Sequence, residues 1–332
     1  MKWQVDRLQF PIREEWINYR NLSLIEHPHG GLIAFVRFQH PISETKQTNI
    51  ISGYYFEEKS STWNRIGDLM PYSSFHESFS QITYLNLMGN LHMMVNFEHQ
   101  LTQQFSYDYG KSWHPSEIIL EDMISWELKN RPLFVQLGRV LLPVFDAGSG
   151  RSFAYISDDT GNSWFPSVFI EPSEESMEDS DFEEISPQGL RSPVFIQAGE
   201  RKILCIMQSQ NRPNLAQAIS NDFGETWSSA VEIKIPSGSG GIDAIRLRDR
   251  NGDYTPVVAL AYGEKKKNGK YALKLAISTD VADTWSETEV IEEFSALYTD
   301  VALLQTDDNK LHVLYSTSIQ VRHLILHDFV IL

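Results

Sequence analysis

The chain has 332 residues, 42% hydrophobic and 22% charged, a globular composition that excludes global disorder. Its 28 Lys and Arg against 44 Asp and Glu give a net charge of −16, which argues against binding to nucleic acid or to an anionic membrane. The opening residues contain no apolar signal region, no run approaches the ~18 apolar residues of a membrane span, and the one cysteine, Cys205, cannot form an internal disulfide. We therefore expect a soluble cytoplasmic protein.

The predicted elements are short strands. Residues 3–10 form the first of them, and runs rich in β-branched and aromatic residues, such as 139–145 and 311–315, recur to the end of the chain. No long stretch keeps the 3.6-residue period of a helix. The sequence therefore predicts an all-β fold.

One eight-residue pattern, Ser-x-Asp-x-Gly-x-Ser/Thr-Trp, recurs between these strands. Its copies are residues 106–113, 157–164, 220–227 and 278–285, and a fifth, degenerate copy ends at Trp63. Successive copies are about 50 to 60 residues apart, a period typical of propeller blades or solenoid arrays.

Each copy is typical of a hairpin turn. The aspartate can accept hydrogen bonds from backbone amides of its own turn, and glycine adopts the positive φ that such turns need. We therefore assign a structural role to four aspartates: Asp108, Asp159, Asp222 and Asp280. In the fourth copy Ala282 replaces the glycine, which should strain that turn or change its type.

A repeat of about 55 residues divides the chain into six units. The last unit has only three strand-like runs, at residues 301–306, 311–316 and 321–332. Residues 3–10 would supply its fourth strand and close the ring. The prediction is a single six-bladed β-propeller domain of four-stranded antiparallel blades over residues 1–332. An insertion at 171–184 holds eight acidic residues, which favours a solvated loop, with a lid or docking segment as the alternative.

The innermost strands of a propeller converge on its central axis, so polar residues that open these strands would meet there. The candidates are Arg20, Arg131, Arg191, Asp243, and Tyr298 with Asp300. Arginine forks bind carboxylates bidentately and stay charged in any pocket, so this set suits an acidic substrate. The alternative for any one arginine is an ion pair with an acid between blades.

The repeated pattern resembles the Asp-box (BNR) repeat of the sialidase superfamily, a family of six-bladed propellers, from about residue 18 to 328. Residues 239–247 and 297–306 are also similar to segments of sialidase-like BNR proteins. Sialidases hold a substrate carboxylate with three arginines and use a tyrosine nucleophile, a glutamate that assists it and an aspartate acid/base. Asp-box propellers include both catalysts and non-catalysts, so the fold alone does not fix the function.

The resemblance implies roles for individual residues. Arg20 lies where the first-blade arginine of sialidases lies, and Tyr298 has a context similar to that of their nucleophile. Glu44 falls near the position of their acid/base, and Asp300 beside Tyr298 would serve as base. The nearest positions for the two other arginines of the triad are Arg191 or Arg212, and Lys270.

The expected function is hydrolysis of an acidic sugar, or of a related carboxylate substrate, in the central pocket, with no cofactor and no metal. Two alternatives stay open. One is an enzyme that uses the same Arg/Tyr pocket for elimination, transfer or cyclisation, and the other is a non-catalytic propeller that binds a partner. Residues 249–253 look like the start of a calcium loop, but without the later glutamate they favour a turn.

Overall fold

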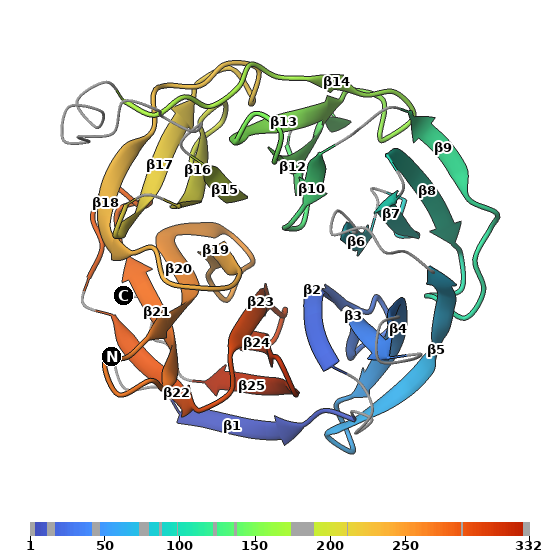
Figure 1. Ribbon diagram of the computed structural model, residues 1–332. Coiled ribbons are helices and arrows are strands. Elements are labelled where there is room, and N and C mark those ends of the chain that lie inside the picture. Colours follow the sequence, from blue (N-terminus) through green and yellow to red (C-terminus); the bar gives the residue numbers. More distant parts are fainter. Residues whose placement is uncertain are drawn as a thin grey trace.

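The computed structural model of the chain describes residues 4–11, 17–41, 47–72, 80–85, 88–97, 99–121, 125–135, 138–173, 189–210, 212–286 and 288–327. Within these ranges the chain forms six antiparallel sheets arranged as blades around a central axis (Figure 1). The predicted six-bladed propeller is confirmed.

The blades follow one another in chain order, and the chain runs outward through each blade from the axis to the rim. Blade 1 holds β2 (Ile17–Glu26), β3 (Leu32–Pro41), β4 (Gln47–Glu57) and β5 (Thr62–Tyr72). Blade 2 holds β6 (Ser80–Leu85), β7 (Leu91–Phe97), β8 (Gln100–Ser106) and β9 (Glu117–Leu120). Blade 3 holds β10 (Trp126–Leu128), β12 (Val140–Asp146), β13 (Arg151–Ser157) and β14 (Phe165–Pro166), with the short β11 (Leu133–Phe134) also paired to β12.

The second half of the ring repeats this order, except that the outermost strand of the last blade is N-terminal. Blade 4 holds β15 (Leu190–Gln197), β16 (Ile203–Ser209), β17 (Asn214–Ser220) and β18 (Val231–Pro236). Blade 5 holds β19 (Ile242–Arg248), β20 (Tyr254–Lys265), β21 (Tyr271–Ser278) and β22 (Glu289–Phe294). Blade 6 holds β23 (Tyr298–Gln305), β24 (Leu311–Thr317), β25 (Val321–His327) and β1 (Gln4–Gln9).

The N-terminal strand closes the ring, as the incomplete last unit predicts. β1 pairs antiparallel with β25, from Gln4 opposite His327 to Gln9 opposite Arg322. This pairing covers the edge that β25 would otherwise expose.

A chain of buried hydrogen bonds also crosses the junction of blades 6 and 1. Trp63 Nε1 lies 3.3 Å from His323 Nδ1, and His323 Nε2 lies 3.0 Å from His312 Nδ1. His312 Nε2 in turn lies 3.3 Å from the hydroxyl of Thr306, which donates to Asp308 at 2.6 Å. Because an indole N–H can only donate, each imidazole must be neutral and donate onward to the next member of the chain.

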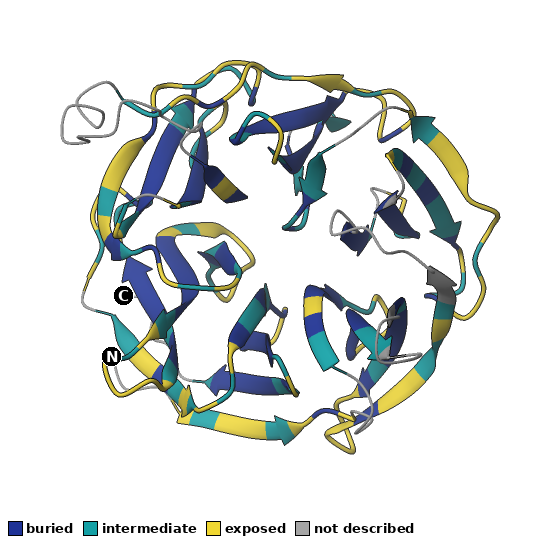
Figure 2. Cartoon of the chain, in the orientation of Figure 1, coloured by how far each residue is buried: buried dark blue, intermediate teal, exposed yellow. Residues whose placement is uncertain are grey.

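The hydrophobic core lies between neighbouring blades. One cluster joins Leu24 and Val36 of blade 1 to Leu314 and Ile325 of blade 6. The inner strands of most blades are therefore buried on both faces, and exposed residues gather on the outer strands (Figure 2). This explains why these inner strands read as continuous apolar runs instead of alternating patterns.

The Asp-box turns are held by their own side chains. Asp108 Oδ1 accepts a hydrogen bond from the Ser112 amide at 2.8 Å and from the Ser106 hydroxyl at 2.9 Å. The Ser106 oxygen accepts in turn from the Gly110 amide at 2.8 Å. The hydrogen bonds from Ser112 lower the pKa of Asp108 to about 2. The same bonds recur at Asp159, Asp222 and Asp280.

The fourth Asp-box keeps the same turn despite its alanine. Ala282 donates its amide hydrogen to Ser278 Oγ at 2.8 Å, as the glycines do in the other copies. Its φ is 66°, and the β-branched Val281 before it has a φ of 57°. Of the two predicted outcomes, strain is therefore the one observed.

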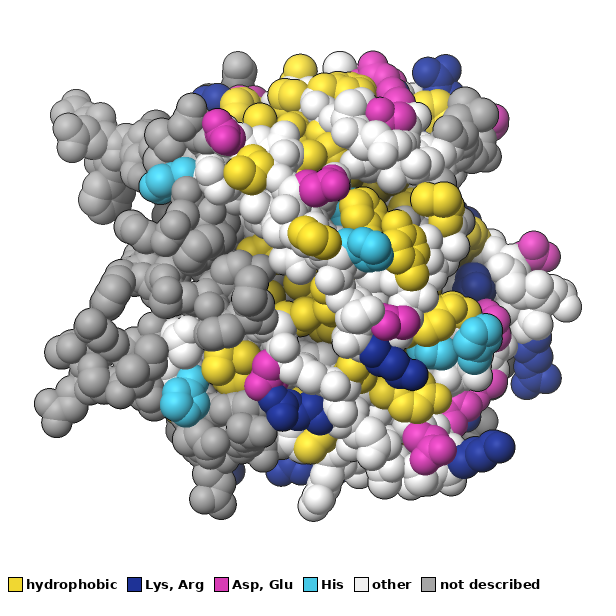
Figure 3. Space-filling model, turned by 90° about the vertical axis from the view of Figure 1, so that its right-hand side faces the viewer, with side chains coloured by type: hydrophobic (Ala, Val, Ile, Leu, Met, Phe, Trp, Pro, Cys, Tyr) yellow, Lys and Arg dark blue, Asp and Glu magenta, His cyan; other side chains and the backbone are white. Residues whose placement is uncertain are grey.

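The outer edge of blade 2 mixes side chains of every kind. β8 and β9 lie at the right of the ring in Figure 1, and Figure 3 shows the molecule from that side. Hydrophobic, acidic, basic and histidine side chains are interspersed over the face shown there. Exposed hydrophobic residues of this blade include Tyr107 and Ile118. In the part of the chain that the structure describes, no helix has the length and apolar character needed to span a membrane.

Of the predicted acidic insertion, only residues 171–173 are within the described ranges. Glu171 pairs there with Arg151 at 3.2 Å. Residues 174–184 lie outside the described residues, and the assignment of the whole chain to one domain stays a prediction.

Candidate functional site

A cavity of about 560 Å³ opens on the face where the innermost strands begin, which we call the mouth face. Its lining comes from five of the six blades and from the segments that lead into β19 and β23. The lining residues are Arg20, Asn21, Arg37, Ser80, Glu127, Lys129, Arg191, Ser192, Gln208, Ser209, Gln210, Ser237, Gly238, Ser239, Gly240, Gly241, Leu297, Tyr298, Thr299 and Asp300. We call it the central cavity. Four of the predicted site residues, Arg20, Arg191, Tyr298 and Asp300, meet there although they are far apart in the sequence.

Two of its arginines are presented by the same backbone irregularity. The register of β2 against β3 shifts directly after Arg20, and the next residue, Asn21, has a φ of 49°. The register of β15 against β16 shifts after Arg191, and the next residue, Ser192, has a φ of 54°. A bulge re-aims the side chain beside it, and both arginines are exposed to the central cavity.

A second arginine of blade 1 lies beside the first. Arg37 on β3 is the Cα partner of Arg20 on β2, so two like charges sit directly across a strand pair. Arg37 is 6% exposed, and burial together with the charge of Arg20 lowers its pKa to about 10. The carboxylates of Asp300 and Glu127 oppose this effect. Two neighbouring guanidiniums repel each other, and an anion beside them reduces this repulsion.

The remaining charged groups of the central cavity are two cations and two acids. Lys129 Nζ pairs with Glu127 Oε2 at 3.0 Å. With the Gln210 amide turned to present its oxygen, that oxygen accepts a hydrogen bond from Arg191 Nε at 3.0 Å. Among the described residues, the lining therefore holds four cationic side chains against the two carboxylates Glu127 and Asp300. It is locally basic in a chain of net charge −16.

Tyr298 and Asp300 form the blade 6 wall of the central cavity. The Tyr298 hydroxyl donates a hydrogen bond to the carbonyl of Gly241 at 2.8 Å. Burial, with the nearby carboxylates of Asp300 and Asp243, raises the pKa of Tyr298 well above its usual value. Burial also raises the pKa of Asp300, although its carboxylate accepts backbone hydrogen bonds from Leu22 and Val301.

Arg131 and Asp243 lie deeper on the axis, outside the central cavity. Arg131 Nη1 pairs with Asp243 Oδ2 at 2.6 Å and donates to the Leu303 carbonyl at 2.9 Å. Asp243 is 3% exposed and also accepts from the Leu303 amide at 2.7 Å, which links blades 3, 5 and 6. Arg131 follows β10 and precedes β11, which both pair with β12, so it lies partway along the inner edge of blade 3 and does not open it as expected.

Two other expected residues, Arg212 and Lys270, are not among the residues that line the central cavity. Arg212 lies between β16 and β17 and pairs with Glu232 at 3.6 Å. Lys270 is exposed in the turn between β20 and β21. Glu44 lies outside the described residues.

Three charged residues of the central cavity were not predicted: Arg37, Glu127 and Lys129. A charged side chain inside the apolar run Ala34–Phe38 was an available signal for Arg37, since a buried charge needs a partner or a function. Glu127 and Lys129 belong to a strand of only three residues and its flank, which is too short for a recognisable pattern.

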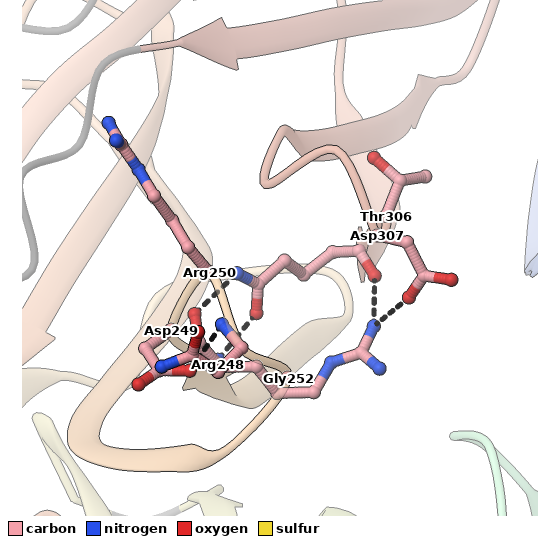
Figure 4. Close-up of a pocket in the computed structure, with 8 residues that line it drawn as sticks. Arg248, Asp249, Arg250, Gly252, Thr306 and Asp307 are labelled. Carbon is pink, nitrogen blue, oxygen red and sulfur yellow. Dashed lines mark hydrogen bonds and ion pairs between the residues drawn. The ribbon is translucent and has the colours of Figure 1, made fainter.

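A second cavity, of about 300 Å³, lies at the opposite ends of β19 and β23 (Figure 4). Its charges are mostly satisfied internally. Arg248 contacts Asp307 at 3.4 Å and the Gln305 carbonyl at 3.1 Å, and Asp249 accepts from backbone amides of its own turn. Residues 249–253 thus form a turn, and among the described residues no group of three metal-ligating side chains converges.

Several known proteins resemble this chain. A family model described as a BNR repeat-like domain matches residues 75–327. A protein of unknown function from Dyadobacter fermentans superposes with a TM-score of 0.69 at 16% identity, over 97% of this chain and 99% of that one. An intramolecular trans-sialidase from Ruminococcus gnavus, solved with oseltamivir carboxylate, gives 0.63 at 13% over 93% and 94%. An α-L-arabinanase from Penicillium chrysogenum, solved with arabinobiose, gives 0.62 at 13% over 98% of each chain. No curated protein matches significantly.

Proposed function

Because the chain belongs to the family of BNR repeat-like domains, we propose that its central cavity binds a carboxylate-bearing sugar and hydrolyses its glycosidic bond. The observation that carries this proposal is the excess of cations, with Arg20, Arg37, Arg191 and Lys129 lining one cavity. Arginine forks recognise a carboxylate bidentately, and the crowding of Arg20 against Arg37 is relieved when an anion binds between them. The sialidase and arabinanase folds support a glycosidase only at the level of fold.

In this proposal Tyr298 attacks the anomeric carbon and the bond to the leaving group breaks. The phenol proton passes to a carboxylate of the central cavity, with Asp300 as the nearest candidate in sequence. Glu44 would protonate the leaving oxygen and then activate the water that releases the sugar from Tyr298. Substrate must first displace the hydrogen bond from Tyr298 to Gly241, because the phenol is held protonated in the free protein.

A second candidate function is carboxylate binding without turnover. The observation that favours it is the same hydrogen bond, together with the raised pKa of Tyr298, since both oppose formation of the nucleophilic phenolate. In this case Tyr298 is a wall of the binding site, and Arg20, Arg37 and Arg191 hold the ligand.

The test is turnover of fluorogenic glycosides, acidic sugars first and neutral ones as comparison, with the wild type, Tyr298→Phe and Arg20→Ala. We expect cleavage of an acidic glycoside only. Tyr298→Phe should abolish it while the protein stays folded, because the ring packing is kept and the lost hydrogen bond to Gly241 costs only about 1–3 kcal/mol. Arg20→Ala should chiefly weaken binding, by about 2–3 kcal/mol, through loss of a charge-assisted fork.

Full activity in a stable Tyr298→Phe protein would refute the nucleophile role. Binding of an acidic sugar with no cleavage in any variant would favour the second candidate. Preference for neutral glycosides would contradict both.

A further inference from the structure

A basic hairpin rises beside the central cavity. The sequence Glu-Lys-Lys-Lys-Asn-Gly-Lys at residues 264–270 spans the end of β20 and the turn into β21. It holds four lysines and one glutamate in seven residues, whereas the chain as a whole has far more acids than bases. We call residues 264–270 the lysine hairpin.

The position of the lysine hairpin is fixed by its contacts at the wall of the central cavity. Gly263, directly before it, packs so closely on the Tyr298 ring that a Cβ atom would not fit there. The Gly263 carbonyl also accepts a hydrogen bond at 3.1 Å from Ser239, a lining residue. At about 3.3 Å per residue, Lys265 lies roughly 7 Å along the strand from the residue that touches Tyr298.

Hydrogen bonds define the turn, so the backbone positions of its lysines are fixed. The Lys266 amide donates to the Lys270 carbonyl at 2.8 Å, and the Lys270 amide donates to the Asn268 side chain at 3.0 Å. Gly269 supplies the positive φ, 81°, that closes the turn.

Most of the positive charge of the lysine hairpin is available to a ligand. Lys266 pairs with Glu293, and Glu264 is paired with Lys274. Lys265, Lys267 and Lys270 are exposed, and within the described ranges none of them makes an ion pair at short distance. Charges on a surface act over about 8 Å at physiological salt, so these lysines reach a ligand only where it leaves the cavity.

We infer that the ligand of the central cavity is one end of an acidic oligosaccharide, whose further negative groups lie along the lysine hairpin. This inference rests on the proposed function and extends it from a single carboxylate sugar to a polyanionic chain. The cavity cations would hold the terminal sugar, while the exposed lysines Lys265, Lys267 and Lys270 would hold the units that follow it. An anionic lipid surface is the competing partner for such a basic tip.

The experiment compares ligand length in a background without turnover. Full-length Tyr298→Phe protein is titrated with N-acetylneuraminic acid and its α2,8-linked hexamer, and with galacturonic acid and its hexamer. We expect one hexamer to bind more tightly than its monomer. The triple substitution Lys265→Gln, Lys267→Gln and Lys270→Gln should weaken hexamer binding about tenfold, since each exposed charge contact contributes a factor of about two to five.

The matched control removes the same charge from the other face of the ring. The control carries Lys59→Gln, Lys111→Gln and Lys202→Gln. These lysines lie in turns at the opposite ends of the blades, so their loss should not change the higher affinity for the hexamer. Raised salt should reduce the affinity of the hexamer more than that of the monomer, and the lysine hairpin variant should lose this difference.

The possible failures are distinguishable. Equal affinity for monomer and hexamer, with both weakened by Arg20→Ala, overturns the inference and leaves the proposed function standing. Hexamer binding that Arg20→Ala leaves unchanged overturns the proposed function. Absence of binding in both series overturns both. Equal affinity for the two lengths, together with lysine-dependent binding to phosphatidylserine vesicles, assigns the lysine hairpin to a membrane surface instead.

Discussion

Arg37 places a buried charge at the central cavity. It is almost fully buried, and its Cα partner across the strand pair is another arginine. A buried charge loses hydration, and like charges directly opposed on a sheet are destabilising. The lowered pKa of Arg37, about 10, reflects both effects.

We expect Arg37→Met to separate stability from binding. Methionine has a similar length and carries no charge, so the free energy of unfolding should stay the same or increase. Affinity for a carboxylate ligand should fall at least tenfold, because one guanidinium fork is lost. Urea unfolding and ligand titration of the same samples measure the two quantities. Marked destabilisation with unchanged affinity would show that Arg37 is structural.

At this scale the sequence predicts the site only in part. Arg20, Arg191, Tyr298 and Asp300 could be placed because each lies in the first half of an innermost strand. Arg37 lies in the middle of β3, the second strand of blade 1, and the convergence of innermost strands predicts nothing for a second strand. Lys270 directly precedes β21 in the sequence, but the turn holds it outside the cavity.

Among the elements, the Asp-box turns differ in what their glycines contact. A Cβ on Gly224 would lie 2.8 Å from Leu141 Cδ1 in the packed core, whereas one on Gly161 would have its nearest neighbour, His92 Cε1, at 3.4 Å. Both positions have a positive φ. The turns are therefore equivalent in backbone and unequal in packing.

Gly224→Ala should accordingly destabilise the protein by about 2–4 kcal/mol, from backbone strain of about 1 kcal/mol and overpacking against Leu141. Gly161→Ala has the strain without the close contact, so about 1 kcal/mol is expected. The tolerated Ala282 in the fourth copy shows that strain alone is acceptable. Chemical denaturation of both variants provides the comparison, and equal losses would contradict the role of packing.

The strands of the propeller were predictable where their apolar runs are long. Residues 311–316 and 301–306 match β24 and β23 closely. Blade 3 shows the limit. Its inner edge is divided between β10 and β11, of three and two residues, and the apolar run at Leu133–Val135 indicates only β11, so the predicted strand misses β10.

On the scale of the whole molecule, the junction of blades 6 and 1 contains two neutral histidines in series. Burial lowers the pKa of His312 to about 4 and that of His323 well below its usual 6.5. Asp308 opposes the shift at His312, whereas Lys310 adds to it. A proton added to either ring would convert its accepting nitrogen into a donor that faces another donor. This would break the chain of hydrogen bonds from Trp63 to Thr306.

Stability should therefore fall on acidification. Since the folded pKa of His312 lies below its unfolded value, the unfolded chain binds more protons between pH 6.5 and about 4. His312 alone should cost about 1.5 kcal/mol of unfolding free energy between pH 6.5 and 5, and His323 should add to this loss. The variant His312→Gln with His323→Gln should show a flatter pH dependence over this range. An unchanged slope would place the sensitivity elsewhere, with His92 as the next candidate.

A ribosome delivers residues 4–9 long before residues 321–327, although these segments are paired in the folded ring. At 5–20 residues per second, the first strand waits about 15 to 60 seconds for its partner. An unpaired strand is a hazard for association with other nascent chains, and charged side chains reduce that hazard. β1 carries Asp6 and Arg7 and stays largely exposed even after closure. Its polar composition therefore suits a strand that has to remain unpaired until β25 has been synthesised.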